Sequence, residues 1–77
     1  MKLIDLQVGE SLKVTNIIDD KNNIKKRLND LGITKSVVIT IKGFAPFGSP
    51  VNISLRGYNL AIDKKYLNNI EGVKVWR

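Results

Sequence analysis

The sequence predicts a small, mainly β protein in which five short strands close into a barrel, with one short α-helix after the first strand. Most segments alternate apolar and polar residues, which is the period of a strand, and only the segment around Leu28 has the period of a helix. A chain of 77 residues cannot leave one face of five strands in water and still form a core. Closure into a barrel buries that face and protects the strand edges.

The N-terminal part of the chain predicts an irregular arm followed by the first strand. Leu3 and Leu6 are spaced to lie on one side, so we expect the arm to place both leucines on the core. From Ser11 to Ile18, apolar residues such as Leu12 and Val14 alternate with polar ones. This alternation predicts a strand over 11–18.

The next segment changes to the period of a helix. Its apolar positions recur at i, i+4 and i+7, namely Ile24, Leu28 and Leu31. Asp20 or Asn22 can cap the free amides at its start, and Gly32 can take the left-handed position after its end. The pattern therefore predicts two or three turns of helix.

Four more strands, two of them paired in a hairpin, complete the barrel. The run from Ser36 to Phe44 is rich in β-branched residues, and we expect Val37, Ile39 and Ile41 to share one face. The rest of the chain predicts strands over 51–55 and 58–62 around the turn Arg56-Gly57, a helical turn over 63–69, and a last strand over 70–76 with a bulge at Gly72.

The composition argues against catalysis. The chain has no histidine and no cysteine, so neither a Ser-His nor a Cys-His nucleophile can form, and a transition-metal site would have only oxygen ligands. The adjacent pair Asp19-Asp20 stands where a helix cap is wanted, and no glycine-rich phosphate loop is present. We therefore predict a protein that is not an enzyme and has no cofactor, bound metal or small-molecule substrate.

Charge and hydropathy indicate where the protein works. Thirteen basic residues against seven acidic ones give a net charge of +6, which favours an anionic partner such as nucleic acid, a membrane surface or an acidic protein face. The start MKLIDLQVGE lacks the long apolar stretch of a signal peptide, and no apolar run approaches the ~18–20 residues of a membrane span. The sequence predicts one cytoplasmic domain over residues 1–77.

The loop Gly43–Pro50, GFAPFGSP, holds two phenylalanines between glycines and prolines. Both rings can serve the core, with Phe44 finishing a strand and Phe47 capping the open end of the barrel. Alternatively, Pro46 and Gly48 hold Phe47 outward as a rigid anchor for a partner. We predict that Phe44 belongs mainly to the core and that Phe47 is mainly a contact residue.

The predicted helix is strongly basic, with Lys21, Lys25, Lys26 and Arg27 crowded around it. An ordinary solvated helix face explains such a cluster, and so does a surface that meets an acidic protein or anionic lipid headgroups. Arg27 adjoins the apolar stripe, where its guanidinium can lie along the barrel and bond to carbonyls or can bind a partner.

Three segments together resemble the ferrous iron transport protein A (FeoA) family: LQVGESLKVTNI, KKRLNDLGIT and KGFAPFGSPVNISLRGYNLAI. The motifs that carry the resemblance are Arg27–Ile33 and Ala45–Val51, and it extends from Leu3 to about Val75. Members of the family are small SH3-like barrels. The family often has glycine where this chain has Ser36, and aspartate where it has Ser49.

The resemblance implies an accessory or regulatory protein of ferrous iron uptake. Such a protein would bind the cytoplasmic part of a GTPase-containing ferrous iron permease, at the inner face of the cell membrane, and would not itself carry iron. The absence of histidine and cysteine agrees with that role, because Fe(II) would lack its softer ligands. The residues that we expect to contact the partner are Pro46, Phe47, Gly48, Lys25, Lys26 and Arg27.

Two other functions compete with this one. A small basic β-barrel can bind nucleic acid, but stacking needs aromatic rings interleaved with cations, and most of the five aromatic residues stand at positions expected to be buried. The third reading is a domain that accompanies a metal-dependent repressor, against which the 77-residue length argues. We rank the permease-binding regulator first and the nucleic-acid binder second.

Overall fold

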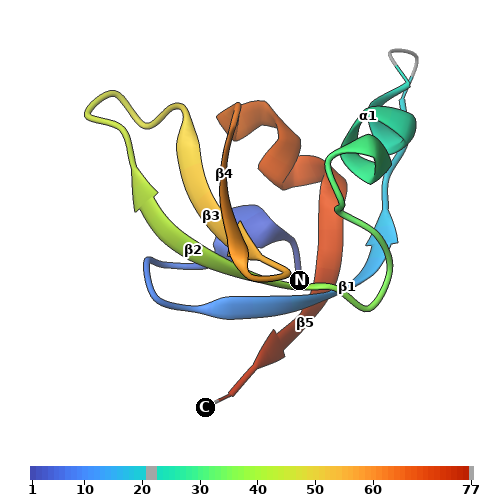
Figure 1. Ribbon diagram of the computed structural model, residues 1–77, viewed down its shortest axis with the longest axis horizontal. Coiled ribbons are helices and arrows are strands. Elements are labelled where there is room, and N and C mark those ends of the chain that lie inside the picture. Colours follow the sequence, from blue (N-terminus) through green and yellow to red (C-terminus); the bar gives the residue numbers. More distant parts are fainter. Residues whose placement is uncertain (21–22, 77) are drawn as a thin grey trace.

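The computed structural model describes residues 1–20 and 23–76 and has a single antiparallel sheet as its frame. In chain order the elements are η1 (Leu3–Asp5), β1 (Ser11–Ile17), α1 (Ile24–Asp30), β2 (Val38–Phe44), β3 (Val51–Leu55), β4 (Tyr58–Ile62), η2 (Lys64–Asn69) and β5 (Ile70–Val75). The strands lie in the order β4-β3-β2-β1-β5, and Figure 1 shows that the sheet curls around its interior. This confirms a mainly β fold of five strands with one short α-helix after the first.

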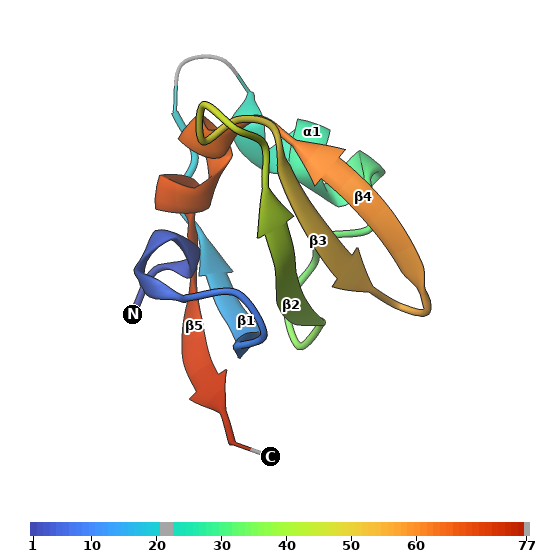
Figure 2. The same cartoon turned by 90° about the vertical axis from the view of Figure 1, so that its left-hand side faces the viewer.

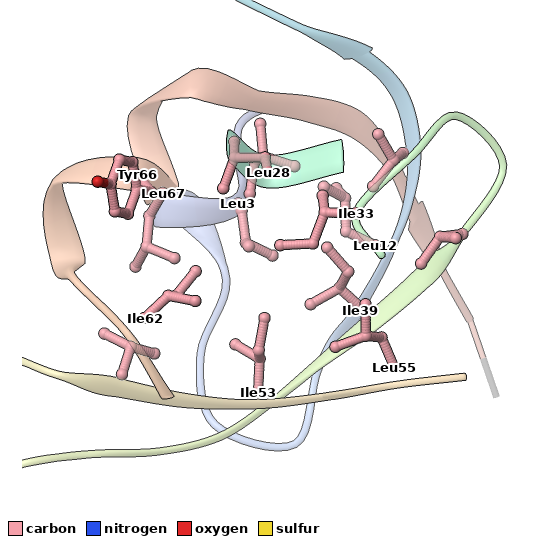
Figure 3. Close-up of a cluster of buried hydrophobic side chains, with 14 of the residues drawn as sticks. Leu3, Leu12, Leu28, Ile33, Ile39, Ile53, Leu55, Ile62, Tyr66 and Leu67 are labelled. Carbon is pink, nitrogen blue, oxygen red and sulfur yellow. The ribbon is translucent and has the colours of Figure 1, made fainter. Parts of the chain in front are cut away.

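The interior of the curled sheet holds a continuous apolar core (Figure 3). Every strand, both 3₁₀ turns and α1 contribute buried side chains, among them Leu3, Leu12, Leu28, Ile39, Ile53, Ile62, Leu67 and Ile70. The arm behaves as expected, because Leu3 and Leu6 are both buried. The face of β2 that carries Ile39 and Ile41 is also the buried one, as the alternation predicts.

The end of α1 follows from its sequence. The amide of Ile33 donates to the carbonyl of Leu28, the amide of Gly32 donates to that of Asn29, and both N···O distances are 2.9 Å. Gly32 has a φ of +93°, so the left-handed position predicted for it is confirmed. The apolar stripe is confirmed too: Ile24 and Leu28 are buried, and Leu31 packs partly buried against the core.

A carboxylate satisfies an amide at the start of α1. Oδ1 of Asp19 accepts a hydrogen bond from the amide of Lys25 at 3.1 Å and another from the amide of Asp20 at 2.9 Å. We expected Asp20 or Asn22 as the cap, but the acceptor of these two hydrogen bonds is Asp19. Asn22 and the predicted surface residue Lys21 lie outside the described residues.

The second strand begins two residues later than its β-branched run predicts. Ser36 has a φ of +75°, which is a left-handed conformation and not the extended one of a regular strand, and β2 begins at Val38. Pairing with β1 nevertheless extends to this point: the Ser36 amide donates to the Val14 carbonyl and the Val14 amide to the Val37 carbonyl.

The bulge predicted in the last strand lies in its partner. The pairing of β1 with β5 shifts between Val14 and Asn16, so the extra residue is in β1, opposite Gly72 and Glu71. The expectation of a bulge at Gly72 was therefore wrong. Position 72 requires glycine for a different reason: a Cβ there would collide with the backbone carbonyl of Lys13.

Candidate interaction surface

One end of the molecule gathers the loop between β2 and β3, η2 and α1. Figure 1 shows η2 between the loop on the left and α1 on the right, with the C-terminal end of β5 at the opposite end of the molecule. Two hydrogen bonds join the three segments: Arg27 of α1 bonds to Tyr66 of η2, and the Lys64 amide of η2 donates to Oγ of Ser49 in the loop. We call this end the loop pole and define it by residues 25–27, 45–50, 64 and 65.

The tip of the loop is a hydrogen-bonded turn. The amide of Gly48 donates to the carbonyl of Ala45 at 2.7 Å, with Pro46 and Phe47 at the two central positions. Proline fixes the φ that the first central position requires, and Gly48 takes a φ of +88°. A second bond, from the Ala45 amide to the Pro50 carbonyl at 3.1 Å, closes the base of the loop. These two hydrogen bonds and Pro46 therefore hold Phe47 on a rigid turn.

Phe47 points fully into solvent, with 100% of its side chain exposed. The expectation that it faces outward is confirmed, while its role as a contact residue stays a prediction. Phe44 differs from expectation, because it is 41% exposed and is not mainly a core residue. A register shift after Ile41 places Phe44 opposite the buried Val51, but at the last residue of β2 only part of its ring is covered.

Basic side chains lie on the segments next to this loop. The Lys64 ammonium lies beside the turn, since a Cβ built on Gly48 would be 3.5 Å from its Nζ. Lys65 extends over the ring of Tyr66, with 5.3 Å from its Nζ to the ring centroid. Lys42 is exposed on β2, two residues before Phe44. An aromatic tip and several cations therefore share the loop pole.

The helix turns its cations away from the core. Lys25, Lys26 and Arg27 are all exposed, whereas the helix buries its opposite face. Nη1 of Arg27 donates to the hydroxyl of Tyr66 at 2.8 Å, so its structural partner is a phenol and not the carbonyls that we expected. This hydrogen bond raises the pKa of Arg27 further above its ordinary value, and the guanidinium stays charged.

A groove of about 470 Å³ lies between α1 and η2. Its lining combines hydrogen-bonding side chains with one aliphatic residue: Asp20, Asn23, Ile24, Arg27, Lys65, Tyr66 and Asn69. Arg27 also borders a smaller hollow, together with Asn23, Lys26 and Asp30. Arg27 is thus the residue that connects the helix face to the groove.

The loop pole includes all six residues predicted from the sequence, in two groups with η2 between them. Pro46, Phe47 and Gly48 form the turn, and residues 25–27 lie on α1, connected to the turn through η2. Sequence reasoning did not single out Lys64, Lys65 or the buried Tyr66 as members of this surface. The adjacent lysines were visible as a charge pair, but their position beside the loop depends on how η2 folds back over the sheet.

The opposite end also exposes an aromatic residue. Trp76 follows β5 and is 80% exposed, and Nζ of Lys74 lies 4.3 Å from its ring centroid. Lys74 also forms an ion pair with Glu10, and this interaction lowers the pKa of the Glu10 carboxyl. The cation at this end is therefore already paired with a carboxylate.

The aromatic residues are more exposed than the sequence suggests. Only Tyr66 is buried, while Phe44, Phe47, Tyr58 and Trp76 are exposed to different degrees, so the expectation that most are buried was wrong. They nevertheless form no stacking platform: the loop that carries Phe47 and the end of β5 that precedes Trp76 lie at opposite ends (Figures 1 and 2), and the Tyr58 hydroxyl donates to the Leu31 carbonyl. This distribution disfavours single-stranded nucleic acid as the partner.

Two features of the described residues bear on other functions. Within residues 1–20 and 23–76, no three histidine, cysteine or carboxylate side chains gather in a way that could hold a metal ion. In the same part of the chain, no helix has the length and apolar character needed to cross a bilayer.

Comparison with known proteins gives a consistent result. The family model described as FeoA domain matches residues 1–74. The FeoA-like protein from Clostridium acetobutylicum is 29% identical, with a TM-score of 0.83 over 95% of this chain and 86% of that one. A crystal structure described as iron uptake regulatory protein (FeoA) is 27% identical, with a TM-score of 0.83 over 97% of both chains.

A third structure names the fold. FeoA from Stenotrophomonas maltophilia, complexed with zinc, is described as an SH3 domain protein possibly acting as a ferrous iron transport activating factor. It is 22% identical, with a TM-score of 0.80 over 95% of this chain and 89% of that one. The fold of this chain is therefore SH3-like. No curated protein matches the sequence closely enough to add to these findings.

Proposed function

This chain belongs to the FeoA family, which is linked to ferrous iron transport, and we propose that it is a cytoplasmic accessory protein that regulates ferrous iron uptake. Its partner is the cytoplasmic part of a GTPase-containing ferrous iron permease. It acts by binding, without catalysis, and the permease recruits it to the inner face of the cell membrane, where its basic surface lies next to anionic headgroups.

The observation that carries this proposal is the loop pole. A ring that is fully exposed on a hydrogen-bonded turn is costly to leave in water and loses little conformational entropy when a partner covers it. In a domain of 77 residues, such a ring is not explained by the needs of the core. Pro46 and Gly48 support this ring without offering a large side chain of their own.

The cations of the loop pole supply the second part of the contact. Lys25 and Lys26 are exposed and project from a helix whose other face is buried, so they are free to meet an acidic surface. Arg27 is held by Tyr66, which fixes the direction of its guanidinium and reduces the entropy lost when it binds. We assign Phe47 as the apolar anchor and residues 25–27 as the charged part of the interface.

Binding to the detergent-solubilised permease, both full length and as its isolated GTPase domain, tests this proposal. Phe47→Ala should weaken binding about ten-fold or more, as truncation of an interface hot spot does. Lys25→Glu with Lys26→Glu should weaken it too, with a smaller dependence on salt than the wild type shows. Trp76→Ala is the matched control, because it removes an exposed aromatic residue from the other end and should bind like the wild type.

Two results would contradict the proposal. If the wild type does not bind the permease in any nucleotide state, the permease is not the partner of this protein. If it binds and Phe47→Ala binds equally well while Trp76→Ala does not, the interface lies at the C-terminal end of β5 and not at the loop pole.

A further inference from the structure

We propose that the loop pole is also a peripheral membrane-binding surface, in which the ring of Phe47 enters the headgroup region of an anionic bilayer while the surrounding lysines contact its phosphates. This deepens the proposed function and rests on it only for the presence of a membrane nearby. Two features carry it: the exposed ring of Phe47, and cations that form no ion pair within the described residues.

The shape of the loop suits insertion into a bilayer. Phe47 stands at a convex tip, on a turn closed by the Gly48–Ala45 hydrogen bond, and its ring is completely exposed. Phe44, 41% exposed at the end of β2, lies three residues before it at the base of the loop. The groove of this pole lies between α1 and η2 and is not lined by either ring. A protruding ring of this kind fits a soft apolar boundary, where aromatic side chains bury well.

The charges around the loop match an anionic surface. Six basic residues belong to the loop pole or border it: Lys25, Lys26, Arg27, Lys42, Lys64 and Lys65. Within the part of the chain that the structure describes, none of them takes part in an ion pair. Four carboxylates lie nearby: Asp19 and Asp63 accept hydrogen bonds from backbone amides at the starts of their helices, and Asp20 and Asp30 border the hollows that Arg27 also lines. The six cations still outnumber these carboxylates, and within the described residues they form no ion pair.

The cations of the loop pole and the ring of Phe47 can act together at a membrane. The surface potential of an anionic leaflet attracts each lysine near it, and this attraction falls off within a Debye length of about 8 Å. Lysine can extend its ammonium along its flexible stem toward headgroups while Phe47 lies deeper. Neither a single ring nor a basic patch anchors a protein stably by itself, but the two combined give reversible surface binding.

The other end of the molecule provides an internal control. Trp76 is also an exposed aromatic residue, but Lys74 beside it is already paired with Glu10. The lysine that stands over this ring is therefore already neutralised by a carboxylate. We expect the two ends to behave differently toward lipid, although both expose a large ring.

Vesicle sedimentation with the purified full chain and no permease tests the inference. Vesicles of phosphatidylcholine are compared with vesicles that also contain phosphatidylglycerol, at low and physiological salt. The wild type should bind only the anionic vesicles, and Phe47→Ala should lower the partition coefficient about ten-fold. Lys64→Glu with Lys65→Glu should lower it at least as much, and Trp76→Ala should leave it unchanged. Far-ultraviolet circular dichroism verifies that each variant is folded.

Tryptophan fluorescence reports whether the ring itself enters the bilayer. A Trp76→Phe, Phe47→Trp double variant carries its only indole at the loop tip, whereas the wild type carries it at the opposite end. On addition of anionic vesicles, emission of the double variant should shift to the blue, and emission of the wild type should stay unchanged.

The outcomes separate this inference from the proposed function. Lack of wild-type binding to anionic vesicles, equal binding of Phe47→Ala, or no blue shift at position 47 would each overturn membrane insertion. If the same wild-type protein still binds the permease in detergent and loses that binding with Phe47→Ala, the proposed function stands alone. If vesicle binding follows the prediction but the permease is not bound, the membrane-binding surface is supported and the proposed protein partner is wrong.

Discussion

The two ends of this small barrel each expose an aromatic ring, but the rings have different surroundings. Phe47 stands on a turn that its own backbone closes, among cations that form no ion pair with the rest of the described chain. Trp76 follows the last strand, under a lysine that Glu10 already neutralises. Exposure of an aromatic ring alone therefore does not identify a binding site. The loop pole differs from the other end because its ring is on a rigid turn and its cations form no ion pair.

The largest expected effect concerns a pair of glycines, one in each half of the sheet. Gly72→Ala in β5 should lower the free energy of unfolding by about 3 kcal/mol, because the new methyl group would collide with the Lys13 carbonyl. Gly43→Ala in β2, close to the loop, meets nothing within 4 Å and should change it by less than about 0.5 kcal/mol. Urea denaturation measures both; equal losses would show that the sheet does not close around Gly72 as described.

A smaller and opposite effect is expected at Ser36, which precedes the strand that leads to the loop pole. Ser36→Gly should raise the free energy of unfolding by about 1 kcal/mol, because glycine adopts a φ of +75° without steric cost. Thermal and urea unfolding of the variant beside the wild type check this. Destabilisation would mean that the serine side chain stabilises the left-handed conformation.

The loop pole also contains one internal hydrogen bond that can be removed cleanly. Tyr66→Phe keeps the buried ring and removes the hydroxyl that accepts the hydrogen bond from Arg27. We therefore expect only a modest loss of stability, well below that of Gly72→Ala. Binding to the permease should weaken more noticeably, since Arg27 loses its fixed direction. A titration that shows unchanged affinity would assign this hydrogen bond a purely structural role.

The smallest effect is expected at the opposite end, where the pKa of Glu10 is lowered by its hydrogen bond and ion pair with Lys74. A carboxyl with a lowered pKa in the folded state stabilises the protein above its ordinary value of 4.5, and this contribution disappears as the pH falls below that value. Glu10→Gln should therefore be slightly less stable than the wild type at neutral pH and equally stable in acid. A difference that grows on acidification would contradict this assignment.

Local sequence patterns were enough to predict most of the fold. Alternation marked the strands, the spacing of Ile24 and Leu28 marked the helix, and Gly32 marked its end, because each of these signals depends on neighbours along the chain. The turn that exposes Phe47 was predictable for the same reason, since Pro46 and Gly48 determine it locally.

What the sequence did not predict depends on contacts between distant segments. The partial exposure of Phe44 depends on the register between β2 and β3, and the extra residue of the bulge lies in β1, opposite Gly72 and Glu71. Lys64 and Lys65 join the loop pole only because η2 folds back beside the loop. Their charges were visible in the sequence, but their location was not.

The central claim is that the loop pole is the surface through which this protein acts. Chemical-shift mapping of the isotope-labelled chain, titrated with the cytoplasmic domain of the permease, tests it most directly. The account predicts that perturbed amides concentrate in residues 25–27, 45–49 and 64–65, with the end of β5 unaffected. Perturbations that concentrate around Trp76 and the end of β5, or that are absent at saturating concentrations of the domain, would contradict it.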